Sequence, residues 1–246
     1  MTPCRATLPL LLLLWSSVPA ALAQEPITLY YHNRPPYLVA DASGTVSGLS
    51  ATPAERAFKQ AKIPFVWASA PTNRQLFTIK QNKTLACSAG WFKTPERETF
   101  AKYTKPIYRD LPAVLIANPA FQLATKATLA QVLTSKGTRV LHKENFSYGP
   151  VVDDLLKQGQ VQLVQTTDEN AAMLKMVRMN MADFMFAAKE EAQYLMEEQG
   201  GDSKQFKLIH LPDMPPGEYR YIMCSKLVPD EVIAKLNAKL NAVIKP

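Results

Sequence analysis

The stretch GWFKTPERETFAKYTKPIY, residues 90–108, contains the most informative helix start in the chain. An apolar run at residues 85–89 precedes it and predicts a strand. Thr94-Pro95 then predicts a helix, because threonine caps first turns and proline is favoured at the first helical position. Arg97 falls in that first turn, where the helix dipole disfavours a cation. A cation in this place indicates that another interaction, such as a bound anion, offsets the unfavourable one.

On both sides of this stretch, short β-rich runs alternate with helical patterns, which predicts an α/β architecture with largely parallel sheets. In the first part, the patterns predict strands at residues 27–32 and 65–68, helices at 52–62 and 72–81, and a hairpin-like excursion at 38–48. The first helix begins with Thr52-Pro53-Ala54-Glu55, which predicts a capping box with Pro53 at the first helical position.

A second series of elements follows an apolar run at residues 111–117. The predicted strands are 138–142, 161–164, 182–187, 206–211 and 220–225, and the predicted helices are 129–133, 148–158, 167–180 capped by Thr167 or Asp168, 189–199 stopped by Gly200-Gly201, and 229–244. Two such series predict two α/β lobes with a cleft between them. Clefts between domains are preferred sites for small ligands.

The first residues have the composition of a secretory signal peptide. Arg5 precedes an apolar run at residues 8–15, and Ala21-Leu22-Ala23 provides small residues at the expected cleavage position. Cys4 lies ahead of the apolar run, whereas a lipid-anchor cysteine would follow it. We therefore expect residues 1–23 to be removed from an exported protein. No later run approaches the roughly 20 apolar residues that cross a bilayer, so we expect no stable membrane insertion.

The charge of the chain is moderately basic, +7 at pH 7, and loss of the leader with its single Arg leaves +6. The positive residues are spread out, without the basic and aromatic interleaving of a nucleic-acid-binding module, so we expect no nucleic-acid partner. The three histidines are scattered, and phosphate-loop and nucleophile-elbow motifs are missing from the sequence. We therefore expect no metal site and no cofactor.

Only Cys87 and Cys224 remain after the leader is removed. In an oxidising compartment, two cysteines form either one disulfide or two buried free thiols, and we favour the disulfide.

Two further groups of side chains have a structural and a functional interpretation. Five methionines could bind Cu(I), but a helix face packed in the core is the favoured interpretation, because methionine fills irregular gaps; they are Met173, Met176, Met179, Met181 and Met185. Three pairs of adjacent acids are interpreted as solvated helix faces, namely Asp153-Asp154, Glu190-Glu191 and Glu197-Glu198.

Several motifs together resemble those of bacterial periplasmic solute-binding proteins of family 3, typified by the amino-acid receptors of ABC transporters. The motifs are RPPYLV from residue 34, then W…NRQLF, then GWFKTPERE…YTKPIY, and NMADFMFA from residue 180. The resemblance implies a two-lobed type II periplasmic-binding-protein fold with two hinge strands, at residues 111–117 and 220–225. It implies a first lobe formed by residues 24–110 and 222–246, and a second lobe formed by residues 111–221.

The resemblance also implies a function, the binding of a small carboxylate-bearing or aromatic solute between the lobes. The partner would be an ABC permease or a membrane sensor, the location the periplasm and the state a monomer. Cys224 would lie on a hinge strand and Cys87 on a strand of the first lobe, close enough to pair.

Arg97 matches the arginine of the T-x-x-R segment, which in the family holds the ligand's carboxylate. The alternative is that Arg97 pairs with a neighbouring acid such as Glu98 or with water, since residues 52–56 form a nearly identical helix start with no reason to suspect a ligand. The resemblance implies other ligand contacts, with core packing or solvation as the alternative for several of them. These residues are Tyr37, Arg74, Trp91, Phe92, Ser147 and Tyr148.

The chain departs from the family where an acid binds the ligand's ammonium group, because that position falls on Ala188. Glu190 lies close by and could substitute. Two other functions remain open. One is an enzyme on the same scaffold, resembling cyclohexadienyl dehydratases, with Glu190 as its catalytic acid. The other is an envelope protein that interacts through its basic surface.

Overall fold

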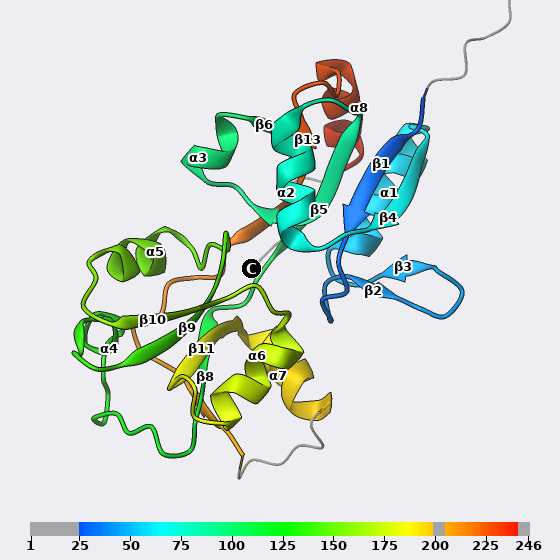
Figure 1. The fold of residues 1–246 in the computed structure, drawn as a ribbon. Helices are drawn as coiled ribbons and strands as arrows, with labels where there is room; N and C mark the ends of the chain where they lie inside the picture. Colours follow the sequence, from blue (N-terminus) through cyan, green and yellow to red (C-terminus); the bar gives the residue numbers. More distant parts are fainter. Residues whose placement is uncertain (1–24, 199–204, 241–246) are drawn as a thin grey trace, which may run out of the picture.

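A computed structural model describes residues 25–198 and 205–240. The predicted leader, the predicted helix stop at Gly200-Gly201 and the end of the last predicted helix lie outside the described residues. Within the described ranges, no helix is long and apolar enough to cross a membrane. The chain forms two lobes, each with a mixed sheet covered by helices on both faces (Figure 1).

The first lobe is formed by both ends of the described chain. Its sheet has the order β4-β1-β5-β13-β6, with β7 also paired to β13. The pairs β1–β4 and β1–β5 are parallel, whereas β13 runs antiparallel to its three neighbours. The strands are β1 (Ile27–Tyr31), β4 (Phe65–Ser69), β5 (Ala86–Phe92), β6 (Ala101–Tyr103), β7 (Tyr108–Arg109) and β13 (Tyr219–Ser225).

Helices α1 (Ala51–Ala61) and α8 (Asp230–Lys239) cover one face of this sheet, and α2 (Thr72–Gln81) covers the other. Phe58 and Ile233 lie in the core of the first face, and Ile79 lies with Met223 in that of the second. Each helix buries an apolar stripe, as an amphipathic helix on a sheet must. The hairpin of β2 (Val39–Ala40) and β3 (Val46–Ser47) extends from the side of the lobe, as predicted (Figure 1).

The second lobe repeats this arrangement with the strand order β10-β9-β11-β8-β12. Here β9 is parallel to β10 and β11, and β8 is antiparallel to β11 and β12. One core lies under α4 and α5, and another under α6 and α7. The elements are β8 (Ala113–Ala117), α4 (Leu129–Thr134), β9 (Arg139–Lys143), α5 (Pro150–Lys157), β10 (Gln162–Thr166), α6 (Asn170–Arg178), β11 (Phe184–Ala188), α7 (Lys189–Glu198) and β12 (Lys207–Ile209).

The prediction that the sheets are largely parallel was wrong. Each sheet contains antiparallel strands beside its parallel strands, because the chain that crosses between the lobes reverses direction on entry. The crossing residues are 110–112 and 210–218, and the predicted hinge runs consist largely of the strands β8 and β13. The two crossings lie side by side, since the Asp110 N–H donates to the Glu218 carbonyl over 2.9 Å.

Two predicted helix caps were also wrong. Helix α1 starts one residue before Thr52, with Ser50 at its N-cap, and the Thr52 hydroxyl accepts a hydrogen bond from Gly48 instead of capping. Helix α6 starts after Glu169, later than the predicted caps. In both cases the buried stripe determines where the helix packs, and the local capping residues do not decide its first residue.

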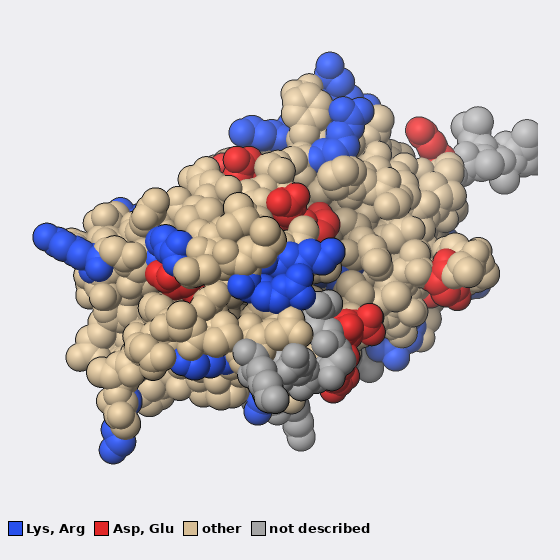
Figure 2. All heavy atoms as spheres, turned by 60° about the horizontal axis from the view of Figure 1, so that its bottom comes forward, with Lys and Arg blue, Asp and Glu red and all other residues tan. Residues whose placement is uncertain are grey.

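Cys87 and Cys224 lie opposite each other on β5 and β13 and form a disulfide, which confirms the favoured alternative. The five methionines do not form a single face. Met173 and Met185 are buried, whereas Met179 and Met181 are exposed. On the face in Figure 2, Lys and Arg side chains stand at several separate places with Asp and Glu among them.

Candidate functional site

A cavity of about 90 Å³ lies between the two lobes and takes side chains from both. A water molecule needs about 10–15 Å³ measured in this way, so the cavity has room for a ligand of several non-hydrogen atoms. Its walls combine three arginines with aromatic rings and carboxylates. The strand ends and loops that form it come from β1, β5, β11, the loop after β9 and the second crossing.

Arg97 lines this cavity and is 7% exposed. Its guanidinium donates to the Phe92 carbonyl over 2.9 Å and to the Asn145 carbonyl of the other lobe over 2.7 Å, and it lies 4.9 Å from the centre of the Trp91 ring. Among the described residues, no carboxylate pairs with Arg97. Glu98, the predicted alternative partner, pairs with Lys93 at 2.7 Å instead. Burial therefore lowers the pKa of Arg97.

The helix that carries Arg97 is short. Thr94 does cap it, accepting from the Arg97 N–H over 3.3 Å, and Pro95 is its first residue. However, α3 (Pro95–Glu98) is a single turn, which has too few aligned peptides to act as a helix-dipole site. The side chain of Arg97, rather than the helix, is the candidate anion-binding group.

A buried chain of hydrogen bonds orients two side chains of the cavity wall. The Trp91 indole donates to Ser88 over 2.6 Å, Ser88 donates to the Gln75 side-chain carbonyl, and the Gln75 amide faces His32 Nδ1 at 3.4 Å. Because Gln75 presents a donor, Nδ1 is the acceptor and Nε2 carries the proton. Burial, followed by the positive charges of Arg34, Lys143 and Arg220, lowers the pKa of His32 to about 3, so the ring is neutral.

Two polar atoms in the cavity wall are buried and have no hydrogen-bond partner within the described chain. They are His32 Nε2 and Thr72 Oγ1, on residues that are 9% and 4% exposed. Unpartnered buried polar groups are uncommon in folded proteins. His32 Nε2 can donate, and the Glu169 carboxylate stands 3.9 Å from it, beyond hydrogen-bond distance. The Thr72 hydroxyl can donate or accept. With Arg97, these atoms suit the cavity to a ligand that accepts hydrogen bonds, such as a carboxylate.

Aromatic rings from both lobes form the apolar part of the wall. Trp91 and Phe92 come from β5, and Phe146 and Tyr148 come from the loop after β9. Ser147 in the same loop donates to Asp153, which also accepts from the Tyr148 N–H over 2.8 Å. The loop is therefore fixed by the first turn of α5.

The other two arginines of the cavity are already paired with carboxylates. Arg220 and Asp110 form a buried two-point ion pair with both distances at 2.6 Å. Burial acts to lower the pKa of Arg220, but the charge and hydrogen bonds of Asp110, together with Tyr37 and Glu191, outweigh it and raise the pKa. Arg34 of the first lobe pairs with Glu191 of the second at 2.7 and 2.8 Å. Two-point arginine–carboxylate pairs are the strongest kind of charge-assisted hydrogen bond.

Five of the predicted ligand-binding residues line the cavity, namely Trp91, Phe92, Arg97, Ser147 and Tyr148. The structure places the other three elsewhere. Tyr37 is buried beneath Arg220, 3.9 Å from ring centre to guanidinium carbon, and its hydroxyl donates to Glu190 over 2.9 Å. Glu190 also accepts from Tyr108 and from the Leu111 N–H. Arg74 is exposed and lies over Phe77.

The sequence analysis did not predict some of the residues that line or support the cavity. Arg34 stands in the RPPYLV motif, but nothing in its neighbourhood reveals that its partner, Glu191, is 157 residues away. The interpretation of adjacent acids as solvated faces was wrong for Glu191, which is 1% exposed, and for Asp153, which holds the loop. The ion pair of Arg220 and Asp110 was also not predicted, because a charged residue at the end of a strand is ordinarily solvated.

No protein-family model and no curated protein matches the sequence. Solved structures do match it, and the three described below share 14–20% of their residues with this chain. One comes from work on glutathione import via GshT and the cystine ABC importer TcyBC of Streptococcus mutans, with 20% identity, a TM-score of 0.70, and coverage of 88% of this chain and 87% of that one. An ancestral arginine-binding protein bound to arginine matches with 14% identity, a TM-score of 0.68, and coverage of 87% of this chain and 90% of that one.

A histidine kinase sensor domain similar to periplasmic binding proteins gives 15% identity, a TM-score of 0.69, and coverage of 87% and 88%. The chain thus has the two-lobed fold of periplasmic binding proteins, as the sequence motifs implied.

Proposed function

We propose that this protein binds a small carboxylate-bearing solute in the cavity between its lobes, with Arg97 holding the carboxylate. The observation that carries this proposal is a guanidinium that is 7% exposed, lines the cavity and has no carboxylate partner among the described residues. Keeping a buried charge unpaired is unfavourable by several kcal/mol, so a site of this kind favours an anion. His32 and Thr72 supply further donors, and the aromatic walls accept the apolar part of the solute.

The experiment is thermal melting of the mature protein against a library of amino acids, dicarboxylates and aromatic acids. A ligand at 100 times its dissociation constant stabilises the folded state by about 2.7 kcal/mol, which is a shift of several degrees in a chain of this size. We expect at least one carboxylate to stabilise the wild type and to lose that effect in Arg97→Ala.

Arg56→Ala is the matched control, because Arg56 follows a similar Thr-Pro motif but is exposed. It should respond as the wild type does. Equal stabilisation of the wild type and Arg97→Ala would show that Arg97 is structural, and a library without any binding carboxylate would contradict the proposal as a whole.

The function is proposed to be binding rather than catalysis. Glu190, the acid expected to serve an enzyme, does not line the cavity and instead accepts hydrogen bonds from Tyr37, Tyr108 and the Leu111 N–H. The Glu190 carboxylate therefore joins the second lobe to the first and does not face the cavity. Recovery of every bound ligand unchanged after incubation supports binding alone.

The proposed setting is the periplasm, with the protein acting as a monomer that delivers its solute to a membrane partner. That partner is an ABC permease or a sensor, since structures similar to this chain come from both kinds of system. Division of the chain at residues 110–111 and 221–222 remains a proposal. The short crossings at 110–112 and 210–218 would be the hinge on which the lobes move.

A further inference from the structure

We propose that the first lobe carries a surface, the α2 patch, that attaches the protein reversibly to membranes containing anionic phospholipid. The patch consists of Phe77, Lys80, Lys83, Lys226 and Leu227. None of these residues lines the cavity between the lobes. The inference therefore goes beyond the proposed function and does not depend on the identity of the solute.

The charge of the mature chain is divided unequally between the lobes. Residues 24–110 and 222–246 contain 16 Lys and Arg against 8 Asp and Glu, whereas residues 111–221 contain 11 against 13. The positive net charge of the mature chain therefore comes from the first lobe. An asymmetry of this kind favours an anionic partner such as a membrane surface, and it assigns that partner to the first lobe.

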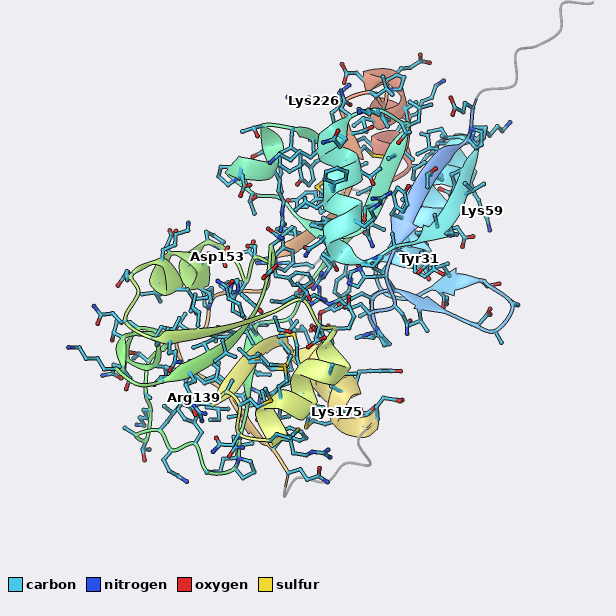
Figure 3. The ribbon with its side chains drawn as sticks, in the orientation of Figure 1. Tyr31, Lys59, Arg139, Asp153, Lys175 and Lys226 are labelled. Atoms are coloured by element: carbon cyan, nitrogen blue, oxygen red, sulfur yellow. A yellow bond between two sulfur atoms is a disulfide. The ribbon has the colours of Figure 1, made fainter. Side chains whose placement is uncertain are left out.

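Two lysines of the patch come from segments far apart in the sequence and meet at one place. Lys80, in the last turn of α2, lies 5.5 Å from the centre of the Phe100 ring. The Lys226 ammonium donates to the carbonyl of Thr99, the residue next to that ring. This place is at the end of the first lobe remote from the second, where Lys226 is labelled in Figure 3.

Two exposed apolar side chains adjoin these lysines. Phe77 precedes Lys80 by three residues on α2, which puts both on one side of the helix, and its side chain belongs to a residue that is 54% exposed. Leu227 is 47% exposed, and its N–H donates over 2.6 Å to Asn82, the residue that ends α2 and precedes Lys83. The patch thus presents apolar and positive groups together.

The lysines of the patch have no acidic partner among the described residues. Lys80, Lys83 and Lys226 are exposed, and none of them forms an ion pair there. Elsewhere on the same lobe several lysines do pair with acids, namely Lys59, Lys93, Lys102 and Lys235. The charges of the patch are therefore free to act on an external anion.

A bilayer surface fits this patch better than a protein partner does. The centre of a protein interface is usually depleted of charge, whereas here lysines adjoin both apolar side chains. Binding to a bilayer requires only shallow insertion of a few apolar side chains and attraction of cations to lipid phosphates. The free ammonium groups supply the charge complementary to anionic headgroups.

Attachment through the patch leaves the cavity clear of the lipid. Thr72, the first residue of α2, lines the cavity, and the patch lies around the other end of the same helix. A helix of 10 residues is about 15 Å long. Solute can therefore enter and leave while the protein is held at the membrane where its proposed partner lies.

The test is co-sedimentation of the full mature protein with protein-free vesicles. One set contains phosphatidylcholine alone, and the other contains equal parts of phosphatidylcholine and phosphatidylglycerol. We expect binding only to the anionic vesicles. It should be present at about 0.1 M salt and lost at about 1 M salt, because the screening length falls from about 10 Å to about 3 Å.

The variant Lys80→Gln/Lys83→Gln/Lys226→Gln should bind anionic vesicles roughly a hundredfold more weakly, since each lysine near the surface contributes about fivefold. Phe77→Ser/Leu227→Ser should also weaken binding severalfold, because less apolar surface enters the interface. Melting temperatures without vesicles show whether the variants fold.

The matched control, Arg56→Gln/Lys59→Gln/Lys62→Gln, removes three exposed cations from the end of α1, on the opposite face of the same sheet, where Lys59 is labelled in Figure 3. It should bind anionic vesicles within about threefold of the wild type, because these side chains lie away from the patch.

Three outcomes would overturn the proposal. The first is a wild type that does not bind anionic vesicles, and the second is an equal loss of binding in the lysine variant and the control. The third is binding to soluble poly-L-glutamate as tight as binding to vesicles, which would indicate an acidic protein partner. Stabilisation by carboxylates should be the same in the lysine variant as in the wild type, so failure of the proposed function and failure of this inference are distinguishable.

Discussion

A guanidinium as deeply buried as that of Arg97 normally has a carboxylate partner, because transfer of a charge from water is unfavourable. Arg34 and Arg220, a short distance along the same cavity, follow that rule with Glu191 and Asp110. Arg97 instead donates to two backbone carbonyls, which satisfy some of its N–H groups but not its charge. At the scale of single residues, this difference separates a binding group from two structural groups.

His32 gives a prediction about pH. Its folded-state pKa of about 3 lies below the ordinary value of 6.5, so the unfolded chain binds the extra proton first as the pH falls. Stability is therefore complete above about pH 6.5 and decreases below it, by at most about 1.4 kcal/mol per pH unit. His32→Asn keeps an acceptor for Gln75 and should flatten this part of the curve in urea unfolding between about pH 6.5 and 5. Parallel curves for the two proteins would contradict the assignment of a neutral, buried ring.

Gly217 gives a prediction about the crossings. A Cβ at this position would lie 1.8 Å from the Asp110 carbonyl oxygen and 2.3 Å from its carbon, so the two crossings could not stay in contact. We expect Gly217→Ala to lower the melting temperature by several degrees, as a backbone clash does. The control is Gly44→Ala, where φ is +84° but no atom lies within 4 Å. An equal, small effect of both substitutions in calorimetry would mean that the crossings are not closely packed.

At this scale the sequence predicted Arg97 and its aromatic neighbours Trp91 and Phe92, because one short motif carries all three. It could not predict the role of Glu191. That role comes from a contact with Arg34, 157 residues away, and adjacent charged residues along a chain are usually solvated.

At the scale of elements, the disulfide joins β5 to β13, the strand that returns from the second lobe. The two cysteines are 137 residues apart, so the bond closes a loop that contains the whole second sheet. Reduction, or substitution of both cysteines by alanine, should lower the free energy of unfolding by about 2–5 kcal/mol. Denaturant unfolding with and without a thiol reductant measures this. No change on reduction would show that the thiols are already free.

The predicted strands in the cores of both lobes were confirmed, since apolar runs such as that of β8 leave few alternatives. Helix starts were predicted less well. Thr94 caps α3 as expected, but the similar Thr52 does not cap α1, because the buried stripe Ala51, Ala54 and Phe58 requires the helix to begin earlier. Local capping signals do not include this tertiary requirement.

At the scale of the whole molecule, polar contacts hold the lobes together around the cavity. Arg34 binds Glu191, Tyr37 binds Glu190, and Arg97 binds the Asn145 carbonyl across the interface. Two adjacent acids of α7 thus join the first lobe at two points. Ligand binding between the lobes and lobe closure would use neighbouring side chains.

Removing one of these contacts should open the molecule. Glu191→Gln leaves Arg34, whose side chain is 14% exposed, without its counter-charge, which is unfavourable by up to about 3 kcal/mol in the closed arrangement. We expect a larger radius of gyration by small-angle X-ray scattering without added ligand. Glu198→Gln, on the exposed side of the same helix, should not change it. An unchanged radius for Glu191→Gln would mean that the ion pair does not control closure.

The two-lobed fold could be predicted from the sequence, because two series of alternating strands and helices and a set of short motifs all indicated it. The closure contacts could not. They depend on how the lobes are placed across the two crossings, and no local pattern encodes that placement.

The central claim, that Arg97 holds a carboxylate between the lobes, is tested most directly by a crystal structure with the carboxylate that stabilises the wild type most. We expect the ligand in the cavity, with a carboxylate oxygen within about 2.7–3.0 Å of the Arg97 guanidinium. A ligand bound outside the cavity, or one whose carboxylate does not touch Arg97, would contradict the account.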